Sequence, residues 1–255
     1  MWHENLTSVR IGEEKINKWG EIVKIVKYDD ANNIIVQFEN GHQTKSNYNM
    51  FSKGNVGSPY NKTIFGVGYL GEGDFLASFD KKLSPTYIVW RNMFVRCYDK
   101  KYQNKNKTYK NCTVCDEWHN FQMFAKWYDD NYYKISGELI DLDKDILSKG
   151  NKIYSPETCC FVPHIINTLF VVNNRTKYPT GVTLRKGCIK YTARCGNGHA
   201  GKRISLGTFS TLEEAFSAYK KCKEEIVKIF ADKYKDKIPQ KLYDAMYKYE
   251  VEITD

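Results

Sequence analysis

The stretch ELIDLDKDILSKGNKIYSPETCCFVPHIINTLF, residues 138–170, decides the expected fold. A mixed apolar and acidic run over 139–143 predicts one strand, and a short apolar run at 153–154 predicts a second strand after the turn at Gly150 and Asn151. Pro163 stands where a helix begins its first turn, and apolar residues then recur at helical spacing. We therefore expect strand, turn, strand and helix, which is a ββα unit.

The residues LDKDI, YSPETC and FVPHIIN make this stretch resemble the ββα-metal, or HNH, nuclease motif of bacteriophage homing endonucleases. The resemblance implies that an Asp at the end of the first strand and an Asn on the helix hold one divalent cation, Mg²⁺ or Mn²⁺. By position these ligands are Asp143 and Asn167. The general base of the family directly follows the metal-binding Asp, and here Lys144 stands there. The family's loop-stapling Asn corresponds to Thr158, so two of the four motif positions depart from the pattern.

Several residues are candidates for the remaining chemistry. Lys144, with an ordinary pKa of ~10.4, is a poor base at neutral pH, although burial can lower the pKa of a lysine. Alternatively, Lys144 stabilises phosphate charge while His164, one position into the helix, or a second water takes the proton. Asp141 and Asp145 are alternative metal ligands, because a one-residue slip of the strand exchanges its two faces.

Length and composition limit the class of protein. The chain has 255 residues with 42% hydrophobic and 15% aromatic residues, enough for packed cores. No apolar run approaches the ~20 residues of a membrane span, and residues 1–15 lack the apolar core of a signal peptide. We expect a cytoplasmic protein, in the host cytoplasm if phage-encoded, with several α+β domains.

Positive charge is concentrated in the last third of the chain. The formal net charge is +9, and residues 177–250 hold 16 Lys or Arg against 8 Asp or Glu. The part over 177–212 has seven basic residues and no acidic residue. A Lys-rich segment can simply be a solvated face, but this concentration on one expected sheet favours a polyanion partner, for which we expect double-stranded DNA.

Residues 1–83 predict two parts. Over 1–60, apolar residues at alternating positions around Asp-Asp-Ala-Asn-Asn and Glu-Asn-Gly predict a β-hairpin and further short strands. We expect a small SH3-like β-barrel here, similar to a module that often precedes such nuclease domains. It either docks on its neighbour or binds DNA or a protein partner. The Gly-rich residues 61–83 read as a linker that partly packs.

Residues 84–172 predict the helical and ββα nuclease domain. Trp90, Met93, Phe94 and Cys97 share one face of a helix over 84–98. A second amphipathic helix is expected between Val114 and Tyr128, with an aromatic stripe that is typical of a core. The order of aromatic residues before the ββα unit is also similar to that of phage HNH proteins, which extends the resemblance over 85–170.

Residues 177–250 predict three short strands followed by a helix from Leu212 to about Tyr234, with Ser210 and Glu213 as its capping box. The segments Gly-Val at 181–182, Tyr-Thr-Ala-Arg at 191–194 and Leu-Gly-Thr-Phe at 206–209 make this part resemble an AP2/ERF-type DNA-binding domain. A sheet can enter the major groove, where Arg reads guanine. The expected DNA-binding residues are Arg185, Lys186, Lys190, Thr192, Arg194, Lys202 and Arg203.

Eight cysteines in an expected cytoplasmic chain indicate thiols or a metal rather than disulfides. A second CxxC pair to match the one at 112 and 115 is missing, so buried free thiols are the alternative to a structural zinc site. The candidate zinc ligands are Cys97, Cys112, Cys115 and Cys159.

These patterns together predict a site-specific, metal-dependent DNA endonuclease of the homing type, nicking one strand or cutting both. The departures at Lys144 and Thr158 support an alternative, a DNA-binding or inhibitor protein that keeps the HNH and AP2-like folds without cleaving.

Overall fold

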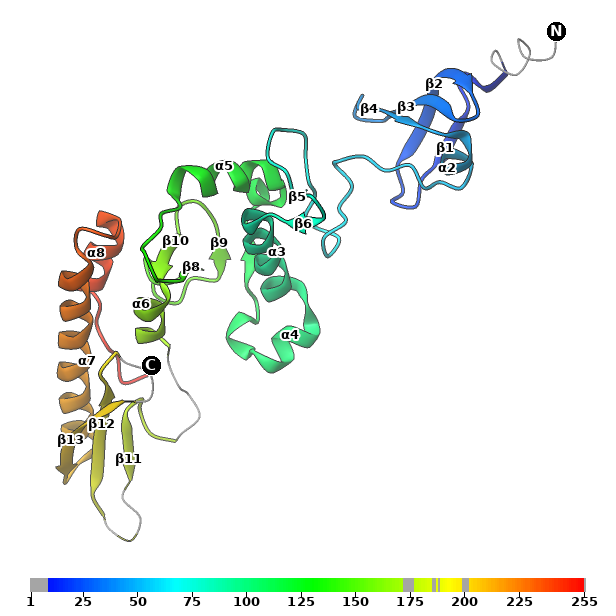
Figure 1. The fold of residues 1–255 in the computed structure, drawn as a ribbon. Coiled ribbons are helices and arrows are strands. Elements are labelled where there is room, and N and C mark those ends of the chain that lie inside the picture. The colour runs from blue at the N-terminus through cyan, green and yellow to red at the C-terminus, as the bar shows by residue number, and fades with distance from the viewer. Residues whose placement is uncertain (1–8, 172–176, 185–186, 188, 199–201, 255) are drawn as a thin grey trace. The chain divides into compact units, whose positions relative to one another are not determined.

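The computed structural model describes residues 9–171, 177–184, 187, 189–198 and 202–254. The chain forms two compact units, one of residues 1–108 and 116–126 and the other of residues 109–115 and 127–255. The strands form several small sheets, and helices lie between them in the sequence (Figure 1). This confirms the α+β class.

The first unit begins with an antiparallel meander. Its four strands pair in chain order, and alternate side chains of the two central strands are buried with Phe51. The predicted hairpin is confirmed, but the described strands form an open sheet rather than the expected barrel. The last strand is short and polar, so it carries no apolar side chains that would close the sheet. The elements are β1 (Glu14–Ile16), β2 (Ile22–Asp30), β3 (Asn33–Phe38), β4 (Gln43–Ser46) and α2 (Tyr48–Ser52).

The Gly-rich stretch after this sheet is packed against residues far away in sequence. The backbone N–H of Tyr69 donates to His119 O at 2.9 Å, and the N–H of Phe121 donates to Tyr69 O at 2.9 Å. A Cβ on Gly71 would lie 2.1 Å from Asn120 Oδ1, so this close approach requires glycine. A small hairpin of β5 (Ser78–Phe79) and β6 (Lys82–Leu83) completes the stretch.

The helix predicted over 84–98 is confirmed as α3 (Pro85–Tyr98), capped by Ser84, and all four residues of its predicted face are buried. The prediction of a second helix between Val114 and Tyr128 was wrong for the first half of that range. Residues 113–114 form a strand, a 3₁₀ turn follows, and the helix begins only at Phe121. The elements are α4 (Lys100–Lys105), η1 (Lys107–Tyr109), β7 (Thr113–Val114), η2 (Asp116–His119) and α5 (Phe121–Asn131).

The predicted strand–strand–helix arrangement lies in the second compact unit of the chain. The second strand of this ββα arrangement is not the one that was predicted. β8 (Ile140–Asp143) pairs antiparallel with β10 (Cys160–Pro163), which leads directly into α6 (His164–Leu169). The predicted second strand exists as β9 (Ile153–Tyr154), but it pairs in parallel with β7. The order strand, strand, helix is thus present with a longer loop between its strands.

Burial on both sides explains why β10 shows no alternating pattern. Phe161 contacts the rings of Trp127, Tyr128 and Tyr132, with centroids 5.1–5.3 Å apart. Val162, on the opposite side of the strand, belongs to the main core of the second unit. A strand that is covered on both faces reads as a continuous apolar run, which periodicity alone does not identify as a strand.

The C-terminal part contains the three predicted strands and the predicted helix. The antiparallel sheet consists of β11 (Val182–Leu184), β12 (Tyr191–Gly196) and β13 (Arg203–Phe209), and α7 (Leu212–Tyr234) follows. The capping box is formed one residue later than predicted, by Thr211 and Glu214. A further helix, α8 (Gln240–Tyr247), was not predicted.

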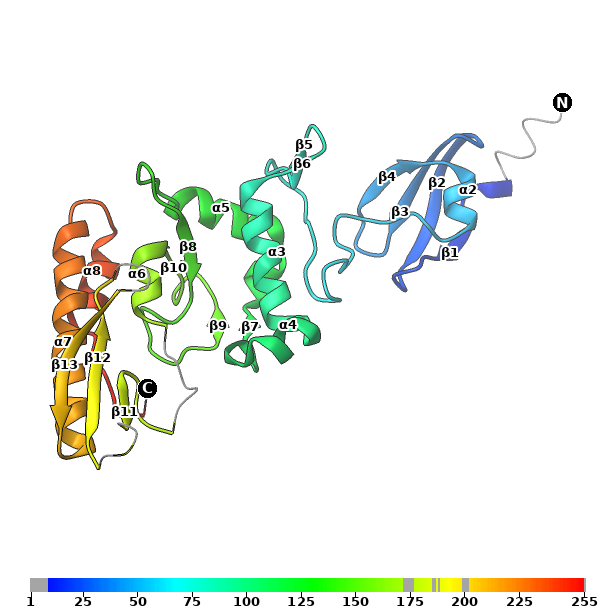
Figure 2. The same cartoon turned by 60° about the horizontal axis from the view of Figure 1, so that its bottom comes forward.

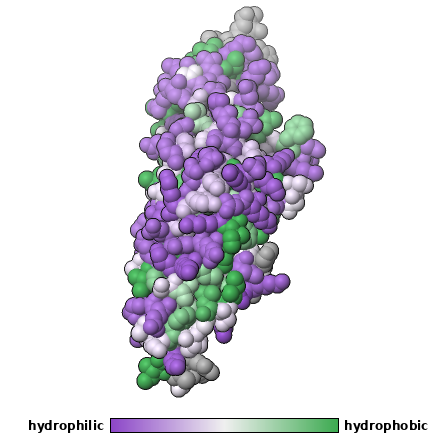
Figure 3. All heavy atoms as spheres, turned by 90° about the vertical axis from the view of Figure 1, so that its left-hand side faces the viewer, coloured by the Kyte–Doolittle hydropathy of each residue, from purple (hydrophilic) through white to green (hydrophobic). Residues whose placement is uncertain are grey.

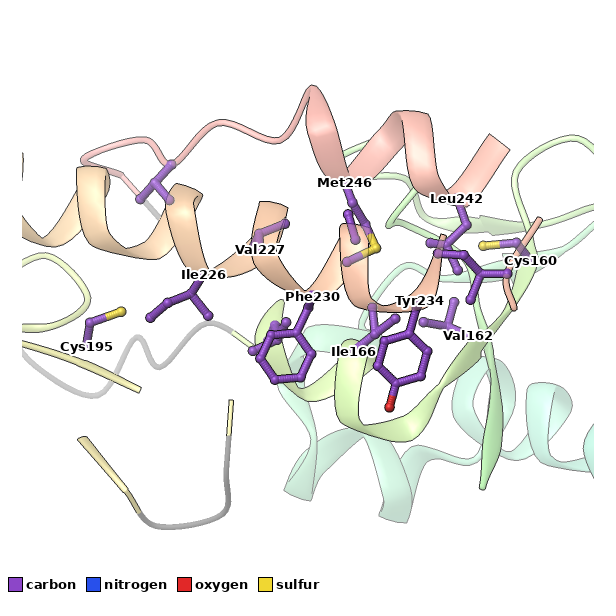
Figure 4. Packing of buried hydrophobic residues seen from close by; sticks show 14 of the residues in the cluster. Cys160, Val162, Ile166, Cys195, Ile226, Val227, Phe230, Tyr234, Leu242 and Met246 are labelled. Carbon is purple, nitrogen blue, oxygen red and sulfur yellow. The ribbon is translucent and has the colours of Figure 1, made fainter. Parts of the chain in front are cut away.

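Helix α7 joins this sheet to the ββα unit. Its first half packs on the sheet through Ala215, while Phe230 and Tyr234 in its second half pack against Val162 and Ile166 (Figure 4). Both views of the ribbon show α7 running from the sheet to α8 (Figure 2). The sheet and the ββα unit therefore share one long helix.

The outward surface of α7 is polar. Figure 3 looks onto the side on which α7 lies in Figure 1, and hydrophilic side chains cover most of that view. Within the described ranges, the structure has no helix that is both long and apolar enough to cross a membrane.

Candidate functional site

The ββα unit brings Asp141, His164 and Asn167 together. Asp141 Oδ2 lies 2.7 Å from His164 Nδ1 and accepts a hydrogen bond of 3.0 Å from Asn167 Nδ2. The His164 side chain is 57% exposed and that of Asp141 32% exposed, so solvent reaches the cluster. All three residues are candidates from the sequence, with Asp141 as an alternative metal ligand.

Strand register and a short connection position these side chains. Asp141 pairs with Val162, two residues before His164, so α6 begins beside the Asp141 end of β8. The backbone N–H of His164 donates to Leu139 O at 2.8 Å, which fixes the start of α6 to the start of β8. Buried side chains on the opposite side of α6 hold the helix on the core. The cluster therefore stands on anchored elements rather than on a loose loop.

Three atoms of the cluster face no partner among the described residues. These are the second carboxylate oxygen of Asp141, the amide oxygen of Asn167 and His164 Nε2. An ionised carboxylate only accepts hydrogen bonds, so Nδ1 of His164 is the donor in this pair, and in the neutral imidazole Nε2 then has the lone pair. The arrangement thus offers two oxygen ligands and one basic nitrogen.

Asp143 lies on the same strand face as Asp141 but in different surroundings. Its Oδ1 accepts hydrogen bonds from the backbone N–H groups of Asp145 at 2.9 Å and Ile146 at 2.7 Å, which shape the turn after β8. Burial, with a contribution from the negative charge of Asp145, raises the pKa of Asp143 to about 6. Asn167 donates to Asp141, and among the described residues it makes no hydrogen bond to Asp143.

Lys144 is buried in the loop and engaged on both sides. Its Nζ donates to Asp145 Oδ2 at 2.8 Å and to Asn151 O at 3.0 Å, and only 6% of the side chain is exposed. Burial by itself lowers the pKa of Lys144, but the hydrogen bond and the charge of Asp145 outweigh it and raise the pKa overall. A lysine that stays protonated and bonded in this way is not available as a base.

Two side chains staple the loop between the strands. Asn151 Nδ2 donates to Lys144 O at 2.6 Å and to Ile153 O at 2.7 Å. Thr158 Oγ1 donates to the same Ile153 carbonyl at 2.8 Å. Sequence analysis identified Thr158 and missed Asn151, whose position directly after Gly150 indicated only a turn.

The C-terminal sheet presents a polar outer face. Thr192 lies on it with its hydroxyl 2.8 Å from that of Thr183, and Arg194 follows two residues later. Because Gly196 pairs with Arg203, the two arginines lie on the same face. Lys190 and Lys202 are exposed next to the strand ends, whereas the predicted contacts Arg185 and Lys186 lie outside the described residues.

The four cysteines predicted as zinc ligands do not come together as a metal site among the described residues. Cys97 is a buried residue of the first unit, and the other three belong to the second. Burial raises the pKa of the Cys159 thiol to about 12 and also raises that of Cys112. No group of three or more His, Cys, Asp or Glu side chains in the described residues is arranged to hold a metal. The zinc ligands stay a prediction.

Comparisons of the chain with protein-family models, with curated proteins and with solved structures find no match.

Proposed function

We propose that the protein is a metal-dependent DNA endonuclease whose reactive residues are Asp141, His164 and Asn167. The observation that supports this most is the exposed contact of Asp141 with both His164 and Asn167, in a ββα unit that shares α7 with a basic sheet. Asp143 and Lys144, the positions implied by the resemblance to HNH nucleases, then shape the loop behind the site.

His164 is the proposed general base. Asp141 accepts a hydrogen bond from Nδ1–H and so holds the imidazole in the tautomer whose Nε2 can take a proton from water. An imidazole oriented by a carboxylate is a recurring device for activating a nucleophile. Phosphodiester hydrolysis needs such a base, and the buried, protonated Lys144 does not provide it.

The ligand set fits a hard divalent cation. The free oxygens of Asp141 and Asn167 are a carboxylate and an amide carbonyl, which are ligand types that suit Mg²⁺ and Mn²⁺. These two residues would hold the ion. When bound, it would stabilise the negative charge that develops on the phosphate and the leaving oxygen.

The outer face of the C-terminal sheet is the proposed DNA contact. Arg194 and Arg203 carry guanidinium groups that have no ion-pair partner among the described residues, and the hydroxyls of Thr183 and Thr192 lie on the same face of the sheet. Arginine donates two hydrogen bonds to guanine in the major groove. We expect Arg194→Ala to weaken duplex binding by ~1–3 kcal/mol.

Cleavage of supercoiled plasmid and of DNA from the gene's own surroundings, with Mg²⁺ or Mn²⁺ and with EDTA, tests the proposal. We expect nicks or breaks that EDTA abolishes and that His164→Ala reduces by ~10²–10⁴-fold. His42→Gln is a matched control, because His42 Nδ1 also lies 2.7 Å from a carboxylate, that of Glu72, outside the proposed site. Equal loss in both variants, or cleavage that persists in EDTA, would contradict the proposal.

The fixed position of Lys144 also favours a second function. Because the residue in the place of the family's base is buried and bonded, a DNA-binding protein that retains the fold without cleaving is the alternative. Tight duplex binding without strand breaks under either cation would establish that alternative.

A further inference from the structure

Four lysines gather on and just after α4, in the first unit of the chain. Lys100, Lys101 and Lys105 lie on the helix and Lys107 follows in η1, and all four are exposed. None has an ion-pair partner among the described residues. We refer to these residues as the α4 lysine patch.

No acidic side chain neutralises the patch from within its own segment. Residues 85–110 contain seven Lys or Arg and a single acid, Asp99. The carboxylate of Asp99 is engaged in capping α4, where Oδ1 accepts the N–H of Lys101 at 2.7 Å and that of Tyr102 at 3.1 Å. Lys101 and Lys105 are four residues apart, so their like charges repel each other across one helical turn.

Core packing does not explain α4. The helix has six residues and none of them is buried, and so short a helix is not stable in water without help. Polar contacts hold it instead. In addition to the Asp99 cap, Gln103 Nε2 donates to the carbonyls of Arg96 at 3.2 Å and Cys97 at 2.5 Å, near the end of α3. The result is a fixed support for lysines that repel each other.

We infer that the α4 lysine patch is a second DNA contact, which binds the phosphate backbone independently of sequence. The inference rests on the proposed function, since it takes duplex DNA as the partner. Lysine ammonium groups act as point charges toward phosphate and do not impose the planar geometry with which arginine reads a base. Bound phosphates would remove the repulsion between Lys101 and Lys105, which nothing within the segment relieves.

The salt dependence of duplex binding by the full chain tests the inference. Each phosphate that a lysine neutralises contributes about 0.9 to the slope of log affinity against log salt. We expect Lys101→Gln/Lys105→Gln to reduce that slope by about 1.8, which corresponds to roughly 60-fold weaker binding at 0.1 M salt. The loss should be equal on specific and random duplexes.

Two control variants separate this role from a structural one. Lys24→Gln/Lys27→Gln removes the same charge from lysines already paired with Glu14 at 3.2 Å and Asp29 at 2.9 Å, and should leave the slope unchanged. Lys101→Arg/Lys105→Arg keeps the charge and should keep the slope. An unchanged slope in the Gln variant, beside intact binding through the sheet, would overturn this inference alone. If the wild-type chain binds no duplex, the proposed function fails as well.

Discussion

Asp141 and Asp143 stand two residues apart on one face of β8, yet their surroundings give them opposite properties. Asp141 is partly exposed and contacts a histidine and an amide on α6. Asp143 is also half-buried, but its Oδ1 accepts hydrogen bonds from two backbone N–H groups of its own turn. Whether an acidic residue at a strand end is reactive or structural therefore depends on what the neighbouring helix and loop place beside it.

The largest expected effect is on cleavage. Asp141→Asn should lower the cleavage rate by ~10³-fold, about 4 kcal/mol of transition-state stabilisation, because His164 loses the carboxylate that orients it. Asp143→Asn should stay within ~10-fold of wild type, because an asparagine Oδ1 can still accept the two backbone hydrogen bonds. The measurement is single-turnover nicking at saturating protein. If Asp143→Asn instead lowered the cleavage rate more than Asp141→Asn, the reaction would take place at Asp143, as the resemblance to HNH nucleases implies.

The second effect concerns the pH dependence of stability. The pKa of Asp143 is about 6 in the folded chain and ~3.9 in an unfolded one. Because the pKa of Asp143 is higher in the folded chain than in the unfolded chain, the folded state binds the proton more tightly. The free energy of unfolding is therefore highest below pH ~4 and falls as the pH rises through 6. Asp143→Asn removes the effect, so its unfolding free energy minus that of wild type should increase by about 2 kcal/mol between pH 4 and pH 7.

Urea unfolding in EDTA at several pH values measures this difference. Asp141→Asn, measured beside it, provides the comparison for a carboxylate that is partly exposed on the same strand. A difference between Asp143→Asn and wild type that is flat with pH would mean that Asp143 is ionised as freely in the folded chain as in the unfolded one.

A third effect comes from the loop behind the strand. Lys144→Met keeps most of the side-chain volume but removes the charge that Asp145 and the Asn151 carbonyl bind. We expect the free energy of unfolding to fall by about 2 kcal/mol, less than for a fully buried pair, because Asp145 is 45% exposed and remains solvated. Cleavage per folded molecule should stay near the wild-type level. A cleavage loss without a stability loss would instead make Lys144 part of the reaction.

The smallest effect on stability is expected for the side chains that hold the loop between β8 and β10 through hydrogen bonds. Asn151→Ala removes the side-chain hydrogen bonds to the Lys144 and Ile153 carbonyls and should lower the unfolding free energy by about 1 kcal/mol. Thr158→Val is the matched variant, since it removes the hydrogen bond to the same Ile153 carbonyl and the hydroxyl contact with Ser155. Thermal unfolding of both should show the smaller shift for Thr158→Val. Equal or inverted shifts would mean that Asn151 does not hold the loop.

Local signals in the sequence determined the elements that form largely by themselves or bury a single face. The four apolar residues of α3 recur at helical spacing and are all buried. The hairpin of β2 and β3 follows from alternating apolar residues around a polar turn. The three-stranded sheet and α7 were predicted because their turns and their apolar stripe are continuous in sequence.

Only the tertiary structure decided which residues meet in the candidate site. β10 is covered on both faces, so it lacks the periodicity that marks a strand, and its pairing with β8 sets the register that brings Asp141 to Asn167. The sequence by itself supplied the candidate residues His164, Asn167 and two alternative acids. The choice between those acids depends on strand register and burial, which are properties of contacts between segments rather than of any one segment.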